Sequence, residues 1–183
     1  RKPVILSDKS SNAQSNIVVL VNLNNLTTDE KKYAANMYNL ILGGGSLETK
    51  LYQKLRVENS LCYNVGSMYQ KYDGLIIITT SVDINKSKLA VQLIKTCLKE
   101  MKTNISDEEL VNAKALVKTS LNMTNDNIGR IVDNAYYQNI SDLDELDVRL
   151  DKFDKVSIRD VKKVAEKTSI STIYVLEGGS TNE

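Results

Sequence analysis

Hydrophobic runs and breaker residues divide the first third of the chain into one strand and two helices. Residues 16–23 form a β-branched run between polar clusters, which predicts a buried strand. Acidic residues after Thr28 favour a helix start, and apolar residues at helical spacing carry this helix to Gly43–Gly45, where it should end. A second helix is expected to begin at once, with Ser46 as its N-cap and leucines four residues apart at positions 47, 51 and 55.

The middle of the chain predicts a hairpin and an amphipathic helix. Residues 63–71 and 75–82 are both strand-like, and they flank Asp73–Gly74, a favoured pair for a tight turn. The apolar stripe over residues 86–102 is typical of a helix that covers one face of a sheet.

The last part of the chain predicts further helices and a closing strand. A capping-box pattern at Ser106–Glu109 starts a helical pattern that is either one unusually long helix or a helix kinked near Gly129. Apolar residues within the acidic stretch 142–154 also recur at helical spacing, and Ser157 is expected to cap a short helix. Residues 172–176 form the final predicted strand.

The order of these elements predicts the fold class. Strands and helices are segregated, without repeating βαβ units, so we expect an α+β fold with an antiparallel sheet and helices packed mainly on one face. No Pro/Gly/Ser-rich linker divides the chain, since Pro3 is its only proline, and residues 1–183 are expected to form a single domain. The first residue is Arg1 rather than Met, which indicates a piece of a longer polypeptide.

Composition excludes several classes of protein. Lys and Arg number 24 against 23 Asp and Glu, the five arginines are scattered, and aromatic residues make up only 5% of the chain. A nucleic-acid partner is therefore not expected, because such proteins need clustered basic and aromatic side chains. A membrane partner is not expected either, since no apolar run approaches the roughly 20 residues that cross a bilayer.

The chain contains no histidine, and this absence limits its chemistry more than any other feature. Histidine is a common metal ligand and the usual general base at neutral pH, so no metal site and no imidazole-based catalysis are expected. Cys62 and Cys97 are too few for a cysteine-only zinc site, and they are expected to be small buried residues in a reducing compartment. Together with the lack of a signal peptide, they favour a cytoplasmic location.

Three groups of residues could carry function, and each has a plainer interpretation. The glycines 43–45 before Ser46 could cradle an anion, or they could form a tight turn between helices. Arg56 and Tyr63 could hold peptide carbonyls, or the arginine could pair with Glu58 and the tyrosine lie half-buried in a strand. The acidic residues from Asp142 to Asp154 lack a calcium-loop pattern and are better explained as a solvated helix face.

Residues 42–67 resemble the signature of the second, non-catalytic domain of the pitrilysin/insulinase family of zinc metallopeptidases, which includes the mitochondrial processing peptidase. The positions that match are Gly43, Gly44, Leu51, Tyr52, Leu55, Arg56, Leu61, Tyr63, Val65 and Ser67. Four positions depart from the family pattern, namely Thr49, Lys50, Ser60 and Cys62. These departures suggest a divergent bacterial member of the zinc-less partner type.

The resemblance implies a role for the chain and for two of its residues. Family members pair a zinc-bearing catalytic domain with a metal-free domain of the same fold, across a chamber that admits peptides. This chain would be the metal-free, C-terminal half, with a zinc-bearing domain or subunit and a peptide substrate as its partners and with zinc held only by that partner. Arg56 and Tyr63 match the family residues that reach the substrate backbone, and Gly43, Gly44 and Gly45 would be a structural turn.

Two hypotheses follow from the sequence. In the first, the chain is the substrate-binding domain of a pitrilysin-type peptidase and is inactive by itself. In the second, the same fold serves only as a non-catalytic partner or scaffold subunit, with no peptidase activity in the assembly.

Overall fold

A computed structural model describes residues 2–125, 128–140 and 143–179 of the chain. Its framework is a five-stranded sheet with the strand order β1-β5-β2-β4-β3. The strands are β1 (Val4–Lys9), β2 (Gln14–Leu23), β3 (Cys62–Gln70), β4 (Leu75–Asp83) and β5 (Thr168–Glu177). As predicted, β3 and β4 form a hairpin that turns at Asp73–Gly74, where Gly74 adopts a φ of 62°.

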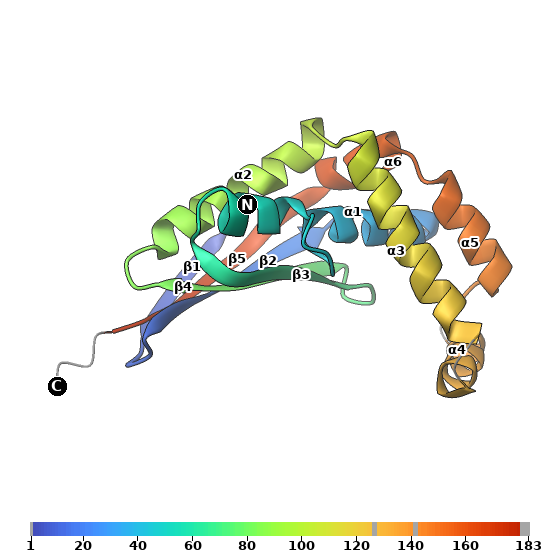
Figure 1. Cartoon of the computed structure of the whole chain (residues 1–183), viewed down its shortest axis with the longest axis horizontal. Coiled ribbons are helices and arrows are strands. Elements are labelled where there is room, and N and C mark those ends of the chain that lie inside the picture. Colours follow the sequence, from blue (N-terminus) through green and yellow to red (C-terminus); the bar gives the residue numbers. More distant parts are fainter. Residues whose placement is uncertain (1, 126–127, 141–142, 180–183) are drawn as a thin grey trace.

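The helices lie over one face of the sheet, and no helix of the described part covers the other face (Figure 1). A helical segment runs from η1 (Glu30–Ala34) directly into α1 (Ala35–Leu42), and η2 (Tyr52–Val57) follows the glycines. The remaining helices are α2 (Ser87–Thr103), α3 (Asp107–Asn125), α4 (Ile128–Ile140), α5 (Leu146–Lys155) and α6 (Ile158–Glu166). Helices α3, α4 and α5 extend past one end of the sheet (Figure 1).

The α+β class is therefore confirmed, with one difference in the sheet. Strands β2, β3, β4 and β5 pair antiparallel, as expected, but β1 pairs parallel with β5, from Val4 opposite Thr172 to Lys9 opposite Glu177. The sequence pattern had not indicated a strand at β1. All six residues of β1 are exposed at the edge of the sheet, so they lack the alternation of a half-buried strand.

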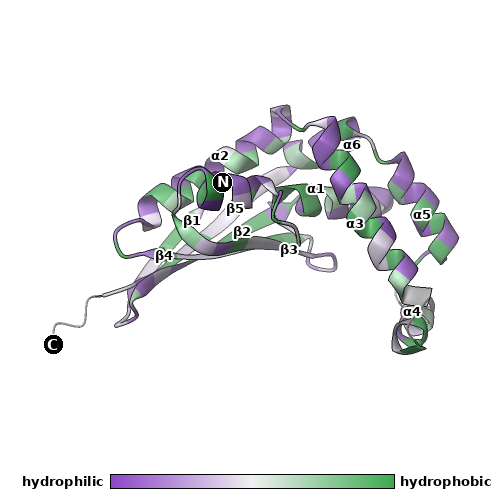
Figure 2. Cartoon of the chain, viewed as in Figure 1, coloured by the Kyte–Doolittle hydropathy of each residue, from purple (hydrophilic) through white to green (hydrophobic). Residues whose placement is uncertain are grey.

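Alternating side chains place the core between the sheet and the helices. In β2, Ile17, Val19 and Val21 are each 1% exposed, whereas the intervening Val18 and Leu20 lie on the helix-free face. Apolar residues of α1, α2 and α6 complete this core from the helix side, and polar residues cover the outer surfaces of the helices (Figure 2). A two-residue period in the strands and a 3.6-residue period in the helices thus bury one continuous core.

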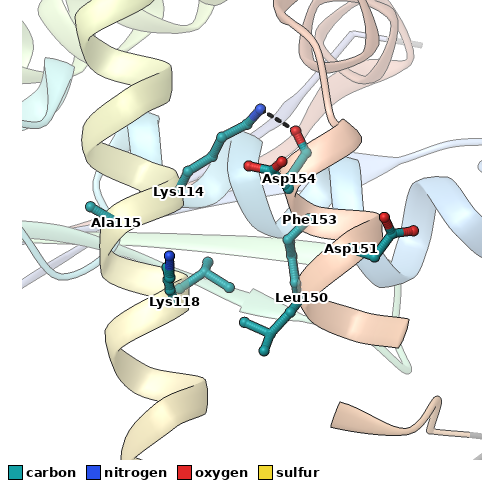
Figure 3. Close-up of a pocket in the computed structure, with 8 residues that line it drawn as sticks. Lys114, Ala115, Lys118, Leu150, Asp151, Phe153 and Asp154 are labelled. Carbon is teal, nitrogen blue, oxygen red and sulfur yellow. Dashed lines mark hydrogen bonds between the residues drawn. The ribbon is translucent and has the colours of Figure 1, made fainter. Parts of the chain in front are cut away.

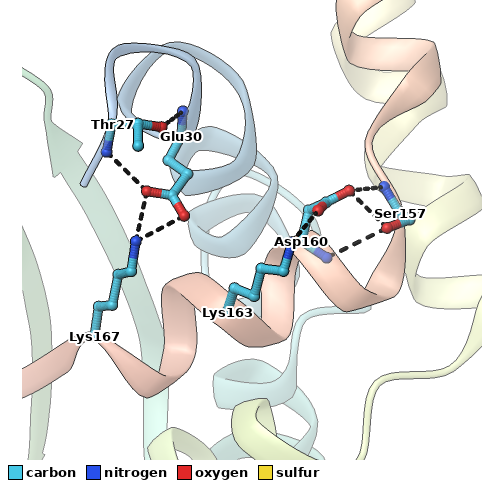
Figure 4. A network of polar contacts seen from close by, with 6 residues as sticks. All are labelled: Thr27, Glu30, Ser157, Asp160, Lys163 and Lys167. Carbon is cyan, nitrogen blue, oxygen red and sulfur yellow. Dashed lines mark hydrogen bonds and ion pairs between the residues drawn. The ribbon is translucent and has the colours of Figure 1, made fainter. Parts of the chain in front are cut away.

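The helix starts agree with the predicted N-caps at two positions and differ at one. The predicted caps at Ser106 and Ser157 are confirmed, and Thr27 and Glu30 form a further capping box that Lys167 joins by an ion pair (Figure 4). The N-cap predicted at Ser46 is wrong. The helix begins only at Lys50, where the Thr49 hydroxyl accepts the Tyr52 N–H, because the residues from 43 to 49 form a loop.

The helices after Ser106 and the two cysteines were also predicted from the sequence. The helical pattern after Ser106 is present as α3 and α4, and residues 126–127, where one long helix and a kinked one would differ, lie outside the described residues. Cys62 and Cys97 are free and buried, as predicted. None of the helices in the described part of the chain is long and apolar enough to cross a membrane.

Candidate functional site

The glycine loop, Gly43–Gly45, ends α1 and turns the chain sharply. The N–H groups of Gly43 and Gly44 both donate to the carbonyl of Asn39, at 2.9 and 2.8 Å, and this closes the last turn of the helix. Gly45 then adopts a φ of 90°, in the left-handed region that favours glycine. The structure thus agrees with the interpretation of these residues as a tight turn.

Strand β3 holds the loop in place from the side. The Ser67 N–H donates to the Gly43 carbonyl at 3.0 Å, and the Ser67 hydroxyl donates to Oδ1 of Asn39 at 2.8 Å. There is no room for a side chain at Gly43, because a Cβ atom there would lie 2.7 Å from Cδ1 of Leu51 and 2.9 Å from the backbone nitrogen of Ser67. Glycine at position 43 therefore allows the loop to lie directly against the strand.

Arg56 lies on η2 and reaches the start of β3. Its Nη1 donates to the Cys62 carbonyl at 3.0 Å, and its side chain is partly exposed. The pairing with Glu58 that residue types suggested is not found, because Lys54 binds the Glu58 carboxylate at 3.0 Å. The hydrogen bond to Glu58 raises the pKa of Lys54.

Tyr63 is the most exposed part of this arrangement, with 82% of its surface accessible. The Arg56 guanidinium lies over its ring, with Cζ 4.8 Å from the ring centroid, a cation–π geometry. The structure therefore brings together the two residues that the sequence singled out. It does not leave the arginine unpaired, as a purely substrate-facing group would be, and it does not bury the tyrosine.

A groove lies along the glycine loop, and Asn64, the residue that follows Tyr63, is part of its lining. One part, of about 380 Å³, lies between the loop, Tyr52 and the helix-free face of β3 and β4, including Asn64, Met68 and Ile77. A second part, of about 400 Å³, continues on the other side of Gly45, Ser67 and Met68, towards η1 and the end of β3. We call these two parts together the glycine-loop groove. Its walls combine apolar side chains with amides and lysines, and no carboxylate from the described part of the chain lines it.

A separate cavity of about 400 Å³ lies between α3 and α5 (Figure 3). Lys114 and Lys118 on α3 and Asp151 and Asp154 on α5 are among its lining residues, and the Lys114 ammonium donates to the Asp154 backbone carbonyl. Apolar side chains of both helices form its floor, as expected for the seam between two packed helices. Neither Arg56 nor Tyr63 lines this cavity.

The acidic stretch makes one set of contacts to η1, through Asp144, and one ion pair within α5, through Asp151. Asp144 accepts bonds from the Tyr33 hydroxyl and the Lys32 ammonium, and Asp151 pairs with Lys155 at 2.6 Å. The bond from Tyr33 lowers the pKa of Asp144. Asp142 lies outside the described residues, and within the described part no three His, Cys, Asp or Glu residues gather as metal ligands would.

Sequence reasoning missed the residues that complete the groove. Asn39 is 7% exposed, and its backbone and side chain support both the loop and Ser67. The lysines of the groove also went unnoticed, because they come from η1 and from the end of β3, which are adjacent only in the folded chain. The one available signal was Ser67, which is part of the family signature.

Solved structures share this fold over almost the whole chain. A conserved protein from Enterococcus faecalis superposes with a TM-score of 0.91 at 22% identity, covering 100% of this chain and 43% of that one. The inactive peptidase domain of a putative zinc protease from Bordetella parapertussis gives a TM-score of 0.72 at 14% identity, covering 94% of this chain and 97% of that one.

Relatives identified by sequence are also described as zinc proteases or as an inactive metalloprotease. A probable inactive metalloprotease from Bacillus subtilis is 25% identical over 153 residues, which are 82% of this chain and 36% of the relative. An uncharacterized zinc protease from Rickettsia felis is 29% identical over 101 residues, which are 54% of this chain and 24% of the relative. The chain thus spans about a third or less of these relatives.

The family described as the peptidase M16 inactive domain matches residues 1–117, which is more than half of the chain and includes the glycine loop, Arg56 and Tyr63. This match, the shared fold and the zinc-protease relatives confirm the resemblance found in the signature. The chain belongs to the peptidase M16 inactive-domain family.

Proposed function

We propose that this chain is the metal-free, substrate-binding half of an M16-type peptidase and that Arg56 and Tyr63 contact the backbone of a bound peptide. The observation that carries the proposal is the stacked pair itself: a guanidinium and an exposed phenol are held together, and Asn64, the residue that follows Tyr63 in β3, lines an open groove. Tyr63 makes no hydrogen bond within the described part of the chain, so its hydroxyl is available as a donor.

The chemistry of the two side chains suits a peptide. A guanidinium has five N–H donors, and the bond to Cys62 uses one of its nitrogens. Peptide carbonyls accept such bonds, and donors that are already in position stabilise the charge that grows on a carbonyl oxygen during acyl transfer. The pair would thus orient a peptide without itself performing acid–base chemistry.

The residues of this chain do not fit a zinc site. It has no histidine, and its two cysteines are buried in different elements, at the start of β3 and within α2. Within the proposal, zinc therefore belongs to a second half with its own ligands, on the same polypeptide or on another subunit. The relative from Bacillus subtilis is about three times longer than the part that matches this chain, which leaves room for such a half. We propose that it docks on the helix-free face of the sheet, where Val18, Leu20 and Ile77 are half-buried.

One observation favours the alternative role as a scaffold. The bond from Arg56 to the Cys62 carbonyl joins η2 to β3, and a purely structural arginine would make the same bond. In that case the chain would fold and assemble with a zinc-bearing half, and peptides would not contact Arg56 or Tyr63.

Peptide binding and cleavage by the assembled enzyme separate the two roles. Tyr63→Phe removes only a hydroxyl, and Arg56→Lys keeps the charge but loses the planar guanidinium. We expect each variant to lower kcat/KM about 10- to 100-fold, the effect of losing one charge-assisted or transition-state hydrogen bond. The midpoint of thermal unfolding should change little for Tyr63→Phe, because the hydroxyl is exposed.

Matched controls come from other exposed residues. Tyr136→Phe on α4 and Arg159→Lys on α6 make the same chemical changes away from the groove, and both should leave kcat/KM unchanged. Equal activity of Tyr63→Phe and its control would favour the scaffold role. The scaffold role would also be favoured if Arg56→Lys lowered stability and lowered activity only as far as that loss of stability explains.

A further inference from the structure

The far part of the glycine-loop groove is basic. Lys31, Lys32 and Lys71 all line it, together with the amides Asn36 and Asn39. Lys31 comes from η1 and Lys71 follows the last residue of β3, and the two segments are joined by a bond from the Tyr69 hydroxyl to the Lys31 carbonyl at 3.1 Å. The fold therefore brings lysines from distant parts of the sequence to one end of the groove.

Two of these three charges lack a counter-ion. Lys32 pairs with Asp144 at 3.2 Å and is thereby neutralised. Lys31 and Lys71, in contrast, form no ion pair with any carboxylate in the ranges that the structure describes. Since the chain as a whole carries a formal net charge of only +1, this pair is a local feature and not part of a generally basic surface.

The other part of the groove differs in character. Leu47, Tyr52, Met68 and Ile77 contribute apolar surface to that part, and no lysine lines it. Both parts share Gly45, Ser67 and Met68, so they adjoin each other along the loop. A ligand that matches the walls would place apolar side chains beside Tyr52 and negative charge beside Lys31 and Lys71.

We propose that Lys31 and Lys71 form a carboxylate-binding subsite, and that this groove selects extended peptides in which an apolar segment is followed or preceded by Asp or Glu residues. The inference rests on the proposed function, because it names the class of peptide that the substrate-binding half accepts. Lys31 and Lys71 are specificity residues in this scheme. Arg56 and Tyr63 contact the backbone of any peptide, whereas the lysines distinguish acidic peptides from neutral ones.

Lys31 is exposed and Lys71 is half-buried, so both would bind a carboxylate in contact with water. Exposed ion pairs are each worth a fraction of a kcal/mol, so two of them should favour an acidic peptide over its amide counterpart about 3- to 10-fold at low salt. The preference should shrink as salt is added, because the Debye length falls to about 10 Å at 0.1 M ionic strength.

Fluorescence anisotropy with the full 183-residue chain tests the subsite. The probes are two labelled peptides with the same apolar segment, one ending in Asp and Glu residues and the other in Asn and Gln. We expect the acidic peptide to bind more tightly to the wild type, and the two peptides to bind equally to a Lys31→Gln, Lys71→Gln double variant. Both changes should preserve the fold, because the bond from Tyr69 uses the backbone of Lys31.

A control variant removes the same charge elsewhere. Lys88 and Lys99 on α2 are exposed and line neither part of the groove, so a Lys88→Gln, Lys99→Gln double variant should keep the preference. Charge reversal provides a second readout: Lys31→Glu with Lys71→Glu should weaken the acidic peptide below the amide peptide. Equal binding of both peptides to the wild type, or equal losses in the groove variant and the control, would overturn the proposal.

The same data distinguish this inference from the function on which it depends. If both peptides bind equally and Tyr63→Phe weakens both, the carboxylate subsite is wrong and the substrate-binding role stands. If neither peptide binds the wild type, both the subsite and the substrate-binding role are contradicted.

Discussion

Replacing Gly43 by alanine tests whether the contact between the glycine loop and β3 maintains the structure. The added methyl group would lie 2.7 Å from Cδ1 of Leu51, 2.8 Å from Oγ of Ser67 and 2.9 Å from the Ser67 backbone nitrogen. Leu51 is fully buried, so its side chain has no space into which it can turn. The loop must therefore move away from the strand, and the 3.0 Å bond from the Ser67 N–H to the Gly43 carbonyl lengthens or breaks.

The size of the effect can be worked out from these contacts. Overpacking at a tightly packed position costs about 1–3 kcal/mol, and weakening one backbone hydrogen bond adds about 1 kcal/mol. We expect a loss of about 2–4 kcal/mol in the free energy of unfolding. For a chain of this length, that loss lowers the midpoint of thermal unfolding by about 4–16 °C. Peptide binding should weaken as well, because the loop forms one wall of the groove.

Two other glycines of the same region serve as controls in thermal unfolding. A Cβ atom at Gly66 would meet only the Gly43 carbonyl oxygen, at an ordinary 3.5 Å, so Gly66→Ala should change stability by less than about 0.5 kcal/mol. Gly45 has open space, but its φ of 90° makes alanine there unfavourable by about 1–2 kcal/mol. If Gly43→Ala unfolds at the same temperature as Gly66→Ala, the close contact with β3 has no energetic importance and our account of the loop is wrong.

Further predictions concern the core and the response to pH. The Tyr38 hydroxyl is fully buried and, in the described part of the chain, has no partner at ordinary hydrogen-bond geometry, with the Thr168 hydroxyl as its polar neighbour. Tyr38→Phe should therefore leave stability unchanged or raise it by up to about 1 kcal/mol in urea unfolding; a clear loss would show that Thr168 is a partner. The free energy of unfolding should stay level between about pH 5 and 8, because the chain has no histidine. In acid the free energy of unfolding should fall. Burial alone would raise the pKa of Glu30, but bonds from Lys167 and Thr27 lower it overall, and the capping-box bonds lower the pKa of Asp160. The stability that these two carboxylates contribute is therefore present above the ordinary carboxyl pKa and lost as the pH falls below it. Glu30→Gln should reduce this acid dependence, and an unchanged acid curve would contradict the assignment.

The sequence predicted those elements of the fold whose signals are local. Period-two alternation identified β2 and β4, a turn pair identified the hairpin, and a 3.6-residue stripe identified α2. Strand β1 could not be found in this way, because its formation depends on pairing with β5 at the opposite end of the chain and it has no buried face of its own. The cap at Ser46 failed for a related reason. The contact of the loop with β3 decides where the helix starts, and local propensity does not report that contact.

In the candidate site, too, the sequence did not reveal which side chains contact each other. Glu58 is two positions from Arg56 and seemed a suitable partner, but residues two apart on a helix do not face each other, whereas Lys54 and Glu58, four apart, do. The resemblance to the family singled out Arg56 and Tyr63, and the structure shows them in contact. It could not indicate Lys31 and Lys71, which lie outside the signature and meet only through the packing of η1 against β3.

The bond from Arg56 to the Cys62 carbonyl bears on both proposed roles. A free arginine side chain loses about 2 kcal/mol of conformational entropy when a ligand fixes it. Here the bond to Cys62 and the stacking on Tyr63 have already restricted the guanidinium, so a peptide that binds to its remaining N–H groups would lose less entropy. The internal bond is therefore compatible with substrate binding as well as with a scaffold. Only the comparison of kcat/KM with stability in Arg56→Lys and Tyr63→Phe separates the two, since a scaffold predicts that the two quantities fall together and a binding site predicts that activity falls first.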